Sequence, residues 1–244
     1  MSAPVFVVPS GRLVPGGLVV VDGAEGRHAA TVTRIAPGET VVLTDGSGRR
    51  GEGVVVSAGR DLVDVEVAEV VVEPAPQPRF VVVQALPKGD RGELAVETLT
   101  EIGVDVVVPW AASRCVTRWR DARGDKALAK WRTSARTAAK QSRRSRFPEV
   151  TRLVTTAEVT ALLAAAALGG VLHESATQPL AAVDLPVEGD VVVVVGPEGG
   201  LADDELAAFG RAGAAAYRLG GTVLRTSTAG TAALAVLSTK VRWR

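Results

Sequence analysis

Residues 191–201, VVVVVGPEGGL, determine the architecture that we expect of the chain. Five consecutive valines are typical of a strand that is buried on both faces, as strands of a parallel sheet are. Gly196 ends this strand, Pro197 restricts the backbone around it, and Gly199 and Gly200 allow a turn because they carry no Cβ. In open α/β sheets, ligands bind beyond the carboxyl ends of the strands. This loop is therefore expected to bind a ligand.

The bulk composition excludes several classes of protein. The chain has 244 residues and a formal net charge of +1, with 47% hydrophobic and 23% charged residues, which is typical of a folded globular protein. Cys115 is the only cysteine, so no intramolecular disulfide can form, and the reducing cytoplasm is the expected compartment. The first residues do not form a secretory signal, and the longest apolar stretch, 161–172, is too short to span a bilayer. One cysteine and two histidines predict no metal site.

The first part of the chain is rich in short runs of β-forming residues separated by turns. The predicted strands are 5–8, 18–21, 31–35, 40–44, 53–57 and 62–72. Repeated short strands at this spacing predict a small barrel. Residues 73–79, EPAPQPR, hold three prolines and no apolar run, which is typical of a linker. We therefore predict one domain at 1–73 and a second at 79–244.

Beyond the linker, predicted strands alternate with predicted helices. The strands are 80–85, 104–109, 170–174, 191–195 and 215–219, and the helices are 91–102, 125–144, 155–168, 203–211 and 229–241. Thr155 and Glu158 form a capping box at the start of one helix. This alternation predicts an α/β domain with a mainly parallel sheet.

Positive charge is concentrated in one segment. Residues 114–152 contain 13 Lys or Arg and only three acidic residues. On the predicted helix 125–144 the basic residues share one face, and the opposite face carries Leu128, Trp131, Ala135, Ala138, Ala139 and Ser142. A basic face is either a solvated helix surface or a binding site for phosphates. Because almost no acidic residues interrupt it, we favour phosphate binding, which supplies affinity while base recognition comes from elsewhere.

The glycine-rich loop lacks the residues of two common nucleotide-binding motifs. It has neither the Lys and Ser/Thr of a phosphate-binding P-loop nor the G-x-G-x-x-G spacing of a dinucleotide site. A strand-to-helix turn without a ligand is the simpler interpretation of one such loop. However, a second segment, LGGTVLRTSTA at 219–229, also follows a predicted strand and also has paired glycines. Two such loops favour a binding site formed from backbone.

Several short motifs follow one another in an informative order. The most specific are GPEGGL at 196–201, Leu219-Gly220 and LRT at 224–226; the others are 28–35, Pro37-Gly38, Asp45-Gly46, Lys88, 100–104, Ser113-Arg114, 139–144, Pro148 and His173-Glu174. Over nearly the whole chain, this series resembles the SPOUT class of S-adenosylmethionine-dependent RNA methyltransferases. Within that class, it resembles most closely the bacterial family that methylates N3 of a uridine in 16S ribosomal RNA.

The resemblance implies a fold and a set of binding residues. It implies a PUA-like barrel at 1–73, a trefoil knot in the second domain, and a homodimer that acts on 16S rRNA, within the small ribosomal subunit. The implied cofactor residues are Leu172, His173, Glu174, Gly196, Pro197, Glu198, Gly199, Gly200, Leu219, Gly220, Leu224, Thr226 and Ala229. The expected RNA-binding residues are Arg27, Arg34, Arg132, Arg136, Lys140, Arg143 and Arg144.

Arg225 is the residue that we expect to act in catalysis. As uracil N3 loses its proton, negative charge develops on O2 and O4, and a fixed cation beside them stabilises the transition state. Arg225 has two alternative roles: it binds the phosphate of the target nucleotide, or it forms an ion pair that only fixes the loop. The sequence departs from the family at Ser227, where the family usually has Glu, and at Ala202, where it usually has Ser as a helix cap.

The sequence leaves alternatives open for the roles of Glu198 and His173 and for the function of the chain. Glu198 binds either a hydroxyl of the cofactor or backbone N–H groups of its own loop. His173 is a structural residue, a residue that supports the site without contacting the substrate, or the base that accepts the proton. The chain as a whole is either the methyltransferase or a non-catalytic RNA-binding factor of ribosome assembly, and binding of S-adenosylmethionine distinguishes the two.

Overall fold

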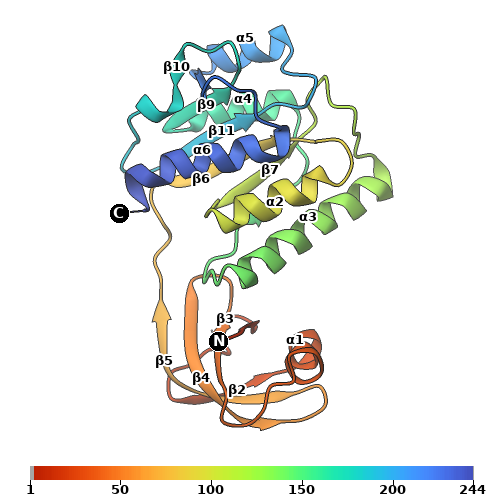
Figure 1. The fold of residues 1–244 in the computed structure, drawn as a ribbon, viewed down its shortest axis with the longest axis vertical. Coiled ribbons are helices and arrows are strands. Elements are labelled where there is room, and N and C mark those ends of the chain that lie inside the picture. The colour runs from red at the N-terminus through yellow and green to blue at the C-terminus, as the bar shows by residue number, and fades with distance from the viewer. Residues whose placement is uncertain (1–2, 244) are drawn as a thin grey trace. The chain divides into compact units, whose positions relative to one another are not determined.

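The chain forms two compact units in the computed structural model, which describes residues 3–243 (Figure 1). The first unit comprises the residues up to Ala75 together with Ala139–Phe147, and the second comprises Pro76–Ala138 and the residues from Pro148 onwards. The sequence placed all of 79–244 in the second domain. The structure instead packs residues 139–147 with the first unit.

The first unit is built on a curled five-stranded sheet. Its strands are β1 (Val5–Val7), β2 (Gly17–Val21), β3 (Thr40–Thr44), β4 (Arg49–Ala58) and β5 (Val63–Val72), in the order β1-β3-β4-β5-β2. β1 pairs with β3 in parallel, and the other neighbours are antiparallel. Phe6, Leu13, Leu43 and Val65 are among the buried residues of its core. The mixed sheet forms the half-barrel that the short strands predicted.

The strand predicted at 31–35 is wrong. Helix α1 (Gly23–Arg27) continues into a π-helical segment, η1 (His28–Thr33), which ends at Arg34 with a φ of 56°. At Gly26 a Cβ would lie 2.4 Å from the carbonyl oxygen of Asp61 and 2.5 Å from that of Val21, so only glycine allows this close packing. Tertiary packing therefore overrides the local β preference of the Thr-Val-Thr sequence.

The second unit contains a seven-stranded sheet in which all neighbouring strands are parallel. Its strands are β6 (Arg79–Ala85), β7 (Val106–Trp110), β8 (Glu149–Val150), β9 (Leu168–Leu172), β10 (Gln178–Pro179), β11 (Asp190–Val195) and β12 (Ala215–Arg218), in the order β10-β12-β9-β11-β6-β7-β8. The parallel sheet is confirmed, and the valine strand β11 lies at its centre. The trefoil knot stays a prediction.

Helices cover both faces of this sheet (Figure 1). They are α2 (Arg91–Glu101), α3 (Asp121–Gln141), α4 (Thr156–Ala165), α5 (Asp203–Arg211) and α6 (Thr226–Val241), with a 3-10 turn η2 (Leu180–Ala182). Gly230 of α6 faces the Val82 side chain, whereas Val81 lines a cavity together with Leu162 of α4. Successive residues of a strand point to opposite faces, so α6 and α4 cover opposite faces of the sheet.

Several predicted boundaries move by a few residues. Thr155 caps α4 through the predicted capping box with Glu158. The helix nevertheless ends at Ala165 instead of residue 168, and β9 ends at Leu172, so that His173 and Glu174 follow the strand. α3 covers 121–141 instead of 125–144, and α6 begins at Thr226 instead of residue 229. None of the described helices has the length and hydrophobicity needed to cross a membrane.

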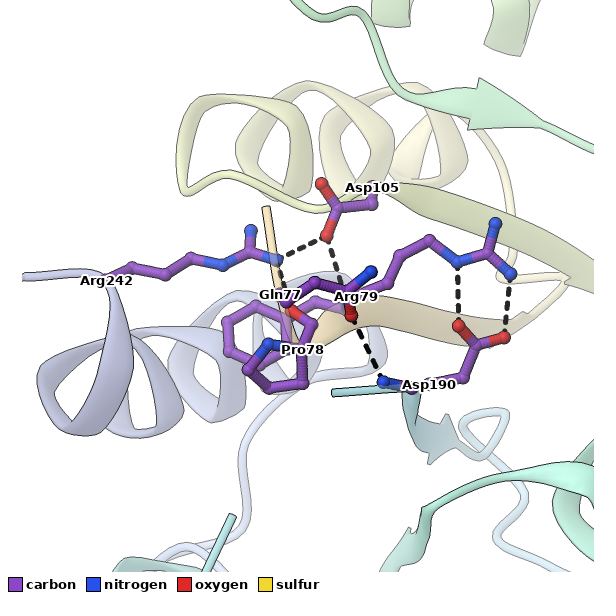
Figure 2. Close-up of polar contacts among 8 residues, drawn as sticks. Gln77, Pro78, Arg79, Asp105, Asp190 and Arg242 are labelled. Atoms are coloured by element: carbon purple, nitrogen blue, oxygen red, sulfur yellow. Dashed lines mark hydrogen bonds and ion pairs between the residues drawn. The ribbon is translucent and has the colours of Figure 1, made fainter. Parts of the chain in front are cut away.

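A polar network fastens the end of α6 to the start of β6 (Figure 2). Arg242 donates from Nη2 to the carbonyl oxygen of Pro78 at 2.8 Å and to Oδ2 of Asp105 at 2.5 Å. Its guanidinium also lies 3.9 Å from the centroid of the Phe80 ring. The side chains of Arg242 and Asp105 are only 14% and 11% exposed, so this ion pair is largely shielded from water. The network therefore holds the residue that follows α6 against the residue that precedes β6.

Candidate functional site

A cavity of about 610 Å³ lies beyond the carboxyl ends of β9, β11 and β12. Its volume is within the range of small-molecule sites. Every residue predicted to bind the cofactor lines it: Leu172, His173, Glu174, Gly196, Pro197, Glu198, Gly199, Gly200, Leu219, Gly220, Leu224, Thr226 and Ala229. The candidate catalytic residue, Arg225, lines the same cavity. The structure therefore brings two loops that are distant in sequence to one site.

The loop after β11 turns sharply and is anchored by Glu198. The N–H of Gly200 donates to the carbonyl oxygen of Pro197 at 2.9 Å, and Gly200 has a φ of +71°, which favours glycine. Glu198 Oε1 accepts a hydrogen bond from the backbone N–H of Lys88 at 3.1 Å. The sequence left a cofactor hydroxyl or the loop's own N–H groups as partners of Glu198. The observed partner is the backbone of another loop, the one between β6 and α2.

Arg114 packs against the same loop, and the sequence did not assign it a role. Its Nη1 donates to the carbonyl oxygen of Gly199 at 3.3 Å. A Cβ at Gly199 would lie 3.2 Å from Cβ of Arg114 and 3.3 Å from its carbonyl oxygen, so the two backbones approach closely. The available signal was the Ser113-Arg114 motif, which the resemblance included. Gly199 is required here for close packing as well as for the turn.

A buried carboxylate, Glu205, holds these segments together. It accepts hydrogen bonds from the N–H of Ser113 at 2.8 Å, from Oγ1 of Thr156 at 3.2 Å and from the N–H of Ala202 at 3.1 Å. Glu205 is only 2% exposed, so each bond acts in a dry environment. The bond to Ala202 is the half of a capping box that does not need the missing Ser side chain.

The loop after β12 joins the first loop at the start of α6. Thr226 Oγ1 donates to the carbonyl oxygen of Gly196 at 3.1 Å. The buried Gln84 of β6 donates from Nε2 to the carbonyl oxygen of Thr226 at 3.3 Å. Gly220, with a φ of +144°, allows the second loop to turn beneath the cavity. The two loops therefore form one hydrogen-bonded clamp.

Charged side chains of both signs line the cavity: four arginines, and the acidic residues Glu174, Glu198 and Asp203. Arg225, Arg91 and Arg218 line it, and within residues 3–243 none of their guanidinium groups has a hydrogen-bond or ion-pair partner. An ion pair that fixes the Arg225 loop is thus not observed in the described part of the chain. The sequence did not single out Arg91 or Arg218. The only signal in the sequence for Arg91 was its position: it is a positively charged residue shortly after the first predicted strand of the α/β domain.

The side chains considered as proton acceptors offer no free base. His173 Nδ1 accepts a hydrogen bond from the N–H of Ser175 at 3.2 Å and lies 2.8 Å from the Ser175 hydroxyl. This local pairing favours the structural role for His173. Burial raises the pKa of Tyr217, which also lines the cavity, so its phenol stays protonated. Ser227, in place of the family Glu, is 4% exposed.

The residues expected to bind RNA do not line the cavity, and several are bound within the protein. Arg27 pairs with Asp61 at 3.3 Å, Lys140 with Glu25 at 2.7 Å, and Arg132 Nε donates to the carbonyl oxygen of Val150 at 3.1 Å. Arg136 and Arg144 also have interaction partners, whereas Arg34 and Arg143 have left-handed backbones. On the predicted inner face of α3, Trp131, Ala135, Ala138 and Ala139 are buried and Leu128 is partly buried, whereas Ser142 is exposed and lies beyond the end of the helix at Gln141.

No cluster of three or more His, Cys, Asp or Glu placed to hold a metal ion occurs among the described residues.

Two family models match the chain. The model described as RNA methyltransferase domain matches residues 73–238, and the model described as RNA methyltransferase PUA domain matches residues 21–68. The first covers the second unit up to residue 238, including both loops of the cavity. The second covers most of the curled sheet.

Curated relatives and solved structures resemble the chain over nearly its full length. Ribosomal RNA small subunit methyltransferase E of Mycobacterium tuberculosis is 49% identical over 233 residues, which cover 93% of this chain and 89% of the relative. The enzyme of the same name from Bacillus subtilis is 27% identical over 226 residues, covering 89% and 88%. A methyltransferase from Legionella pneumophila in complex with S-adenosylmethionine superposes with a TM-score of 0.86 at 27% identity, covering 98% of both chains. Ribosomal RNA small subunit methyltransferase E from Neisseria gonorrhoeae, bound to S-adenosyl methionine, superposes with a TM-score of 0.86 at 26% identity, also covering 98% of both chains.

Proposed function

Because this chain belongs to the ribosomal RNA small subunit methyltransferase E family, it is a ribosomal RNA methyltransferase, and we propose that it methylates N3 of a uridine in 16S rRNA with S-adenosylmethionine as the methyl donor. The observation that carries this proposal is the clamp of two glycine-rich loops, which gathers all predicted cofactor residues around one cavity.

The residues of the cavity fit S-adenosylmethionine. Leu172, Leu219, Leu224 and Ala229 supply apolar surface for the adenine ring, and the turns around Gly199 bring backbone polar groups to the ligand without Cβ atoms. The bound cofactor supplies a methyl group activated by its sulfonium centre. The chain's own residues orient the cofactor and hold the target base in line with this methyl group.

Arg225 stabilises the uracil as N3 loses its proton. Its guanidinium lines the cavity and has no partner within the described chain, so its donors are available for O2 or O4 of the base. Contact with the phosphate of the target nucleotide is the second role that this geometry permits. Neither His173, which is engaged by Ser175, nor the neutral Tyr217 is assigned as the base.

We propose a homodimer as the working form, and cytoplasmic ribosome assembly as its setting. Large apolar side chains are exposed on α2 and at the two ends of α6: Leu94 is 45% exposed, Val223 76% and Trp243 53%. A second copy of the chain that covers them would bury this apolar surface, of which Val223 lines the cavity. Sedimentation analysis at micromolar concentration tests this assembly.

Labelled-methyl transfer tests the activity. The enzyme is incubated with labelled S-adenosylmethionine and either unmethylated small subunits or protein-free 16S rRNA, and the RNA is digested to locate 3-methyluridine. We expect label in this nucleoside with at least one substrate. Absence of transfer to either substrate together with absence of cofactor binding would favour the non-catalytic assembly factor, and label in another nucleoside would refute the N3 assignment.

A further inference from the structure

Arg91 is a half-buried cation that has no charge partner in the described part of the chain. It is the first residue of α2 and lines the cavity, while its guanidinium makes no hydrogen bond or ion pair with residues 3–243. A partly buried charge is costly unless it is paired. Arginine pairs with phosphate through two parallel hydrogen bonds. Arg91 therefore has the position and chemistry to bind an anionic group of a ligand.

The backbone that carries Arg91 is held rigidly. Glu198 fixes the N–H of Lys88, and Thr117 Oγ1 donates to the carbonyl oxygen of Pro87 at 2.8 Å. On the other side, a Cβ at Gly92 would lie 2.6 Å from Nε1 of Trp131, so α2 begins directly against the indole of α3. Such support fixes the direction in which a side chain leaves the backbone. Arg91 thus lies at the start of α2, which contacts Trp131 of α3 on one side, and lines the cavity.

The first half of α3 carries further cations without partners. Arg123, Lys126 and Lys130 are exposed and make no polar contact with residues 3–243. At 100° per residue they lie within about 60° of one another, on one face of the helix and over about 10 Å of its length. Lys130 precedes Trp131, the residue that touches the start of α2. The free cations of α3 are therefore in its first half, whereas Arg132 and Lys140 in its second half are bound within the protein.

We propose that Arg91 binds the RNA phosphate next to the target uridine, and that Arg123, Lys126 and Lys130 continue this contact along the adjoining backbone. This inference rests on the proposed function and names the surface that presents the RNA to the site. A cofactor carboxylate carries one charge and needs one cation, whereas a nucleic-acid backbone offers a series of phosphates to a series of cations. Arg91 and the three unpaired cations of α3 together offer such a series to the RNA backbone.

The variant Arg91→Gln tests the proposal on the full-length protein. We expect kcat/KM for unmethylated small subunits to fall about 10-fold or more, because a charged hydrogen-bonded contact is lost. The slope of log affinity for 16S rRNA against log salt should become shallower by about one unit. The Kd of S-adenosylmethionine, measured by calorimetry, should stay within about two-fold of the wild-type value, because Arg91 contacts the RNA and not the cofactor. Arg91→Lys should restore part of the RNA affinity, since it restores the charge without the planar fork.

Two further variants make the test specific. Arg211→Gln removes an exposed arginine of α5 that does not line the cavity, and it should change none of these values. Lys126→Gln combined with Lys130→Gln should weaken RNA binding and leave the cofactor Kd unchanged. An unaltered RNA affinity and salt slope in Arg91→Gln, or a large rise in its cofactor Kd, would overturn the proposal. If the wild-type protein methylates no RNA, the proposed function fails, while the RNA-binding measurement still decides the role of Arg91.

Discussion

Thr226 Oγ1 donates a hydrogen bond to the carbonyl oxygen of Gly196, 3.1 Å away. This bond joins the first residue of α6 to the last residue before the turn of the other cavity loop. Because Gln84 in turn binds the carbonyl oxygen of Thr226, the two loops and β6 share one anchor. The Thr226 hydroxyl therefore links the two loops that form the cavity.

The substitution Thr226→Val should weaken cofactor binding. Valine keeps the shape of threonine but cannot donate to Gly196, so the loops lose their direct link. We expect the Kd of S-adenosylmethionine to rise about three- to ten-fold, as for the loss of a typical hydrogen bond. Thr239→Val is the matched control, because Thr239 lies in the last turns of α6 and bonds only within its helix. An unchanged Kd in Thr226→Val would refute the role of this link.

Gly199→Ala should impair cofactor binding through the backbone of Arg114. The added Cβ would lie 3.2 Å from Cβ of Arg114, so one of the two segments must shift. We expect the cofactor Kd to rise about 10-fold, the effect of roughly 1–3 kcal/mol of overpacking. Gly221→Ala is the control, since a Cβ at Gly221 meets nothing within 4 Å. Equal affinities of the two variants would contradict the close-packing requirement.

Arg225→Ala should lower kcat with little effect on cofactor affinity. If the guanidinium stabilises the charge that develops on the uracil, its removal costs about 100-fold in kcat. Single-turnover methylation of small subunits measures this, with Arg211→Ala as a control remote from the cavity. A normal kcat would remove Arg225 from the catalytic assignment, and a raised KM for RNA with normal kcat would support its role as a phosphate ligand instead.

Glu205→Ala should destabilise the second unit. It leaves the N–H groups of Ser113 and Ala202 and the hydroxyl of Thr156 without their acceptor in a buried region. We expect the free energy of unfolding to fall by about 2–4 kcal/mol, measured by urea denaturation. Glu97→Ala, at an exposed position of α2, should change it little. A loss no larger than that of Glu97→Ala would show that Glu205 is not an organising residue.

Stability should show a contribution from Glu158 that disappears in acid. Its hydrogen bond with Arg152, and then those with Thr155, lower the pKa of Glu158 from its ordinary 4.5 to about 2. A carboxyl group with a lowered pKa stabilises the fold above its ordinary pKa, and this contribution is lost as the pH falls towards 2. The difference in Tm between wild type and Glu158→Gln should therefore narrow between pH 5 and pH 3. A difference that is constant with pH would contradict the pKa shift.

The second unit was predictable from sequence because its signals are local. The valines of β11 and the capping box of Thr155 were sufficient to place a buried strand and a helix start, and both are confirmed. By contrast, the helical 23–33 segment depends on the approach of Gly26 to Asp61, a contact distant in sequence. Two-residue strands such as β8 have no periodicity from which to be recognised.

The candidate site was predictable where motifs mark backbone turns, and not where long side chains converge. Gly196 and Gly220 could be placed in loops after strands, and the structure brings them to one cavity. Arg91 and Glu205 could not be assigned, because their importance follows from what surrounds them in space. Similarly, the charge pattern of α3 did not distinguish Lys140, which is paired with Glu25, from Lys130.

The first unit is formed by two segments that are separated in the sequence, because residues 139–147 pack with the residues up to Ala75. Lys140 supplies the ion-pair partner of Glu25, Ser145 binds Glu73, and the N–H of Phe147 donates to the carbonyl oxygen of Gly46 at 2.8 Å. A fragment that stops at Ala75 lacks all three contacts. Recombination at the proline-rich linker therefore does not exchange an intact module: a swap of N-terminal units between relatives keeps its packing only if residues 139–147 travel with it.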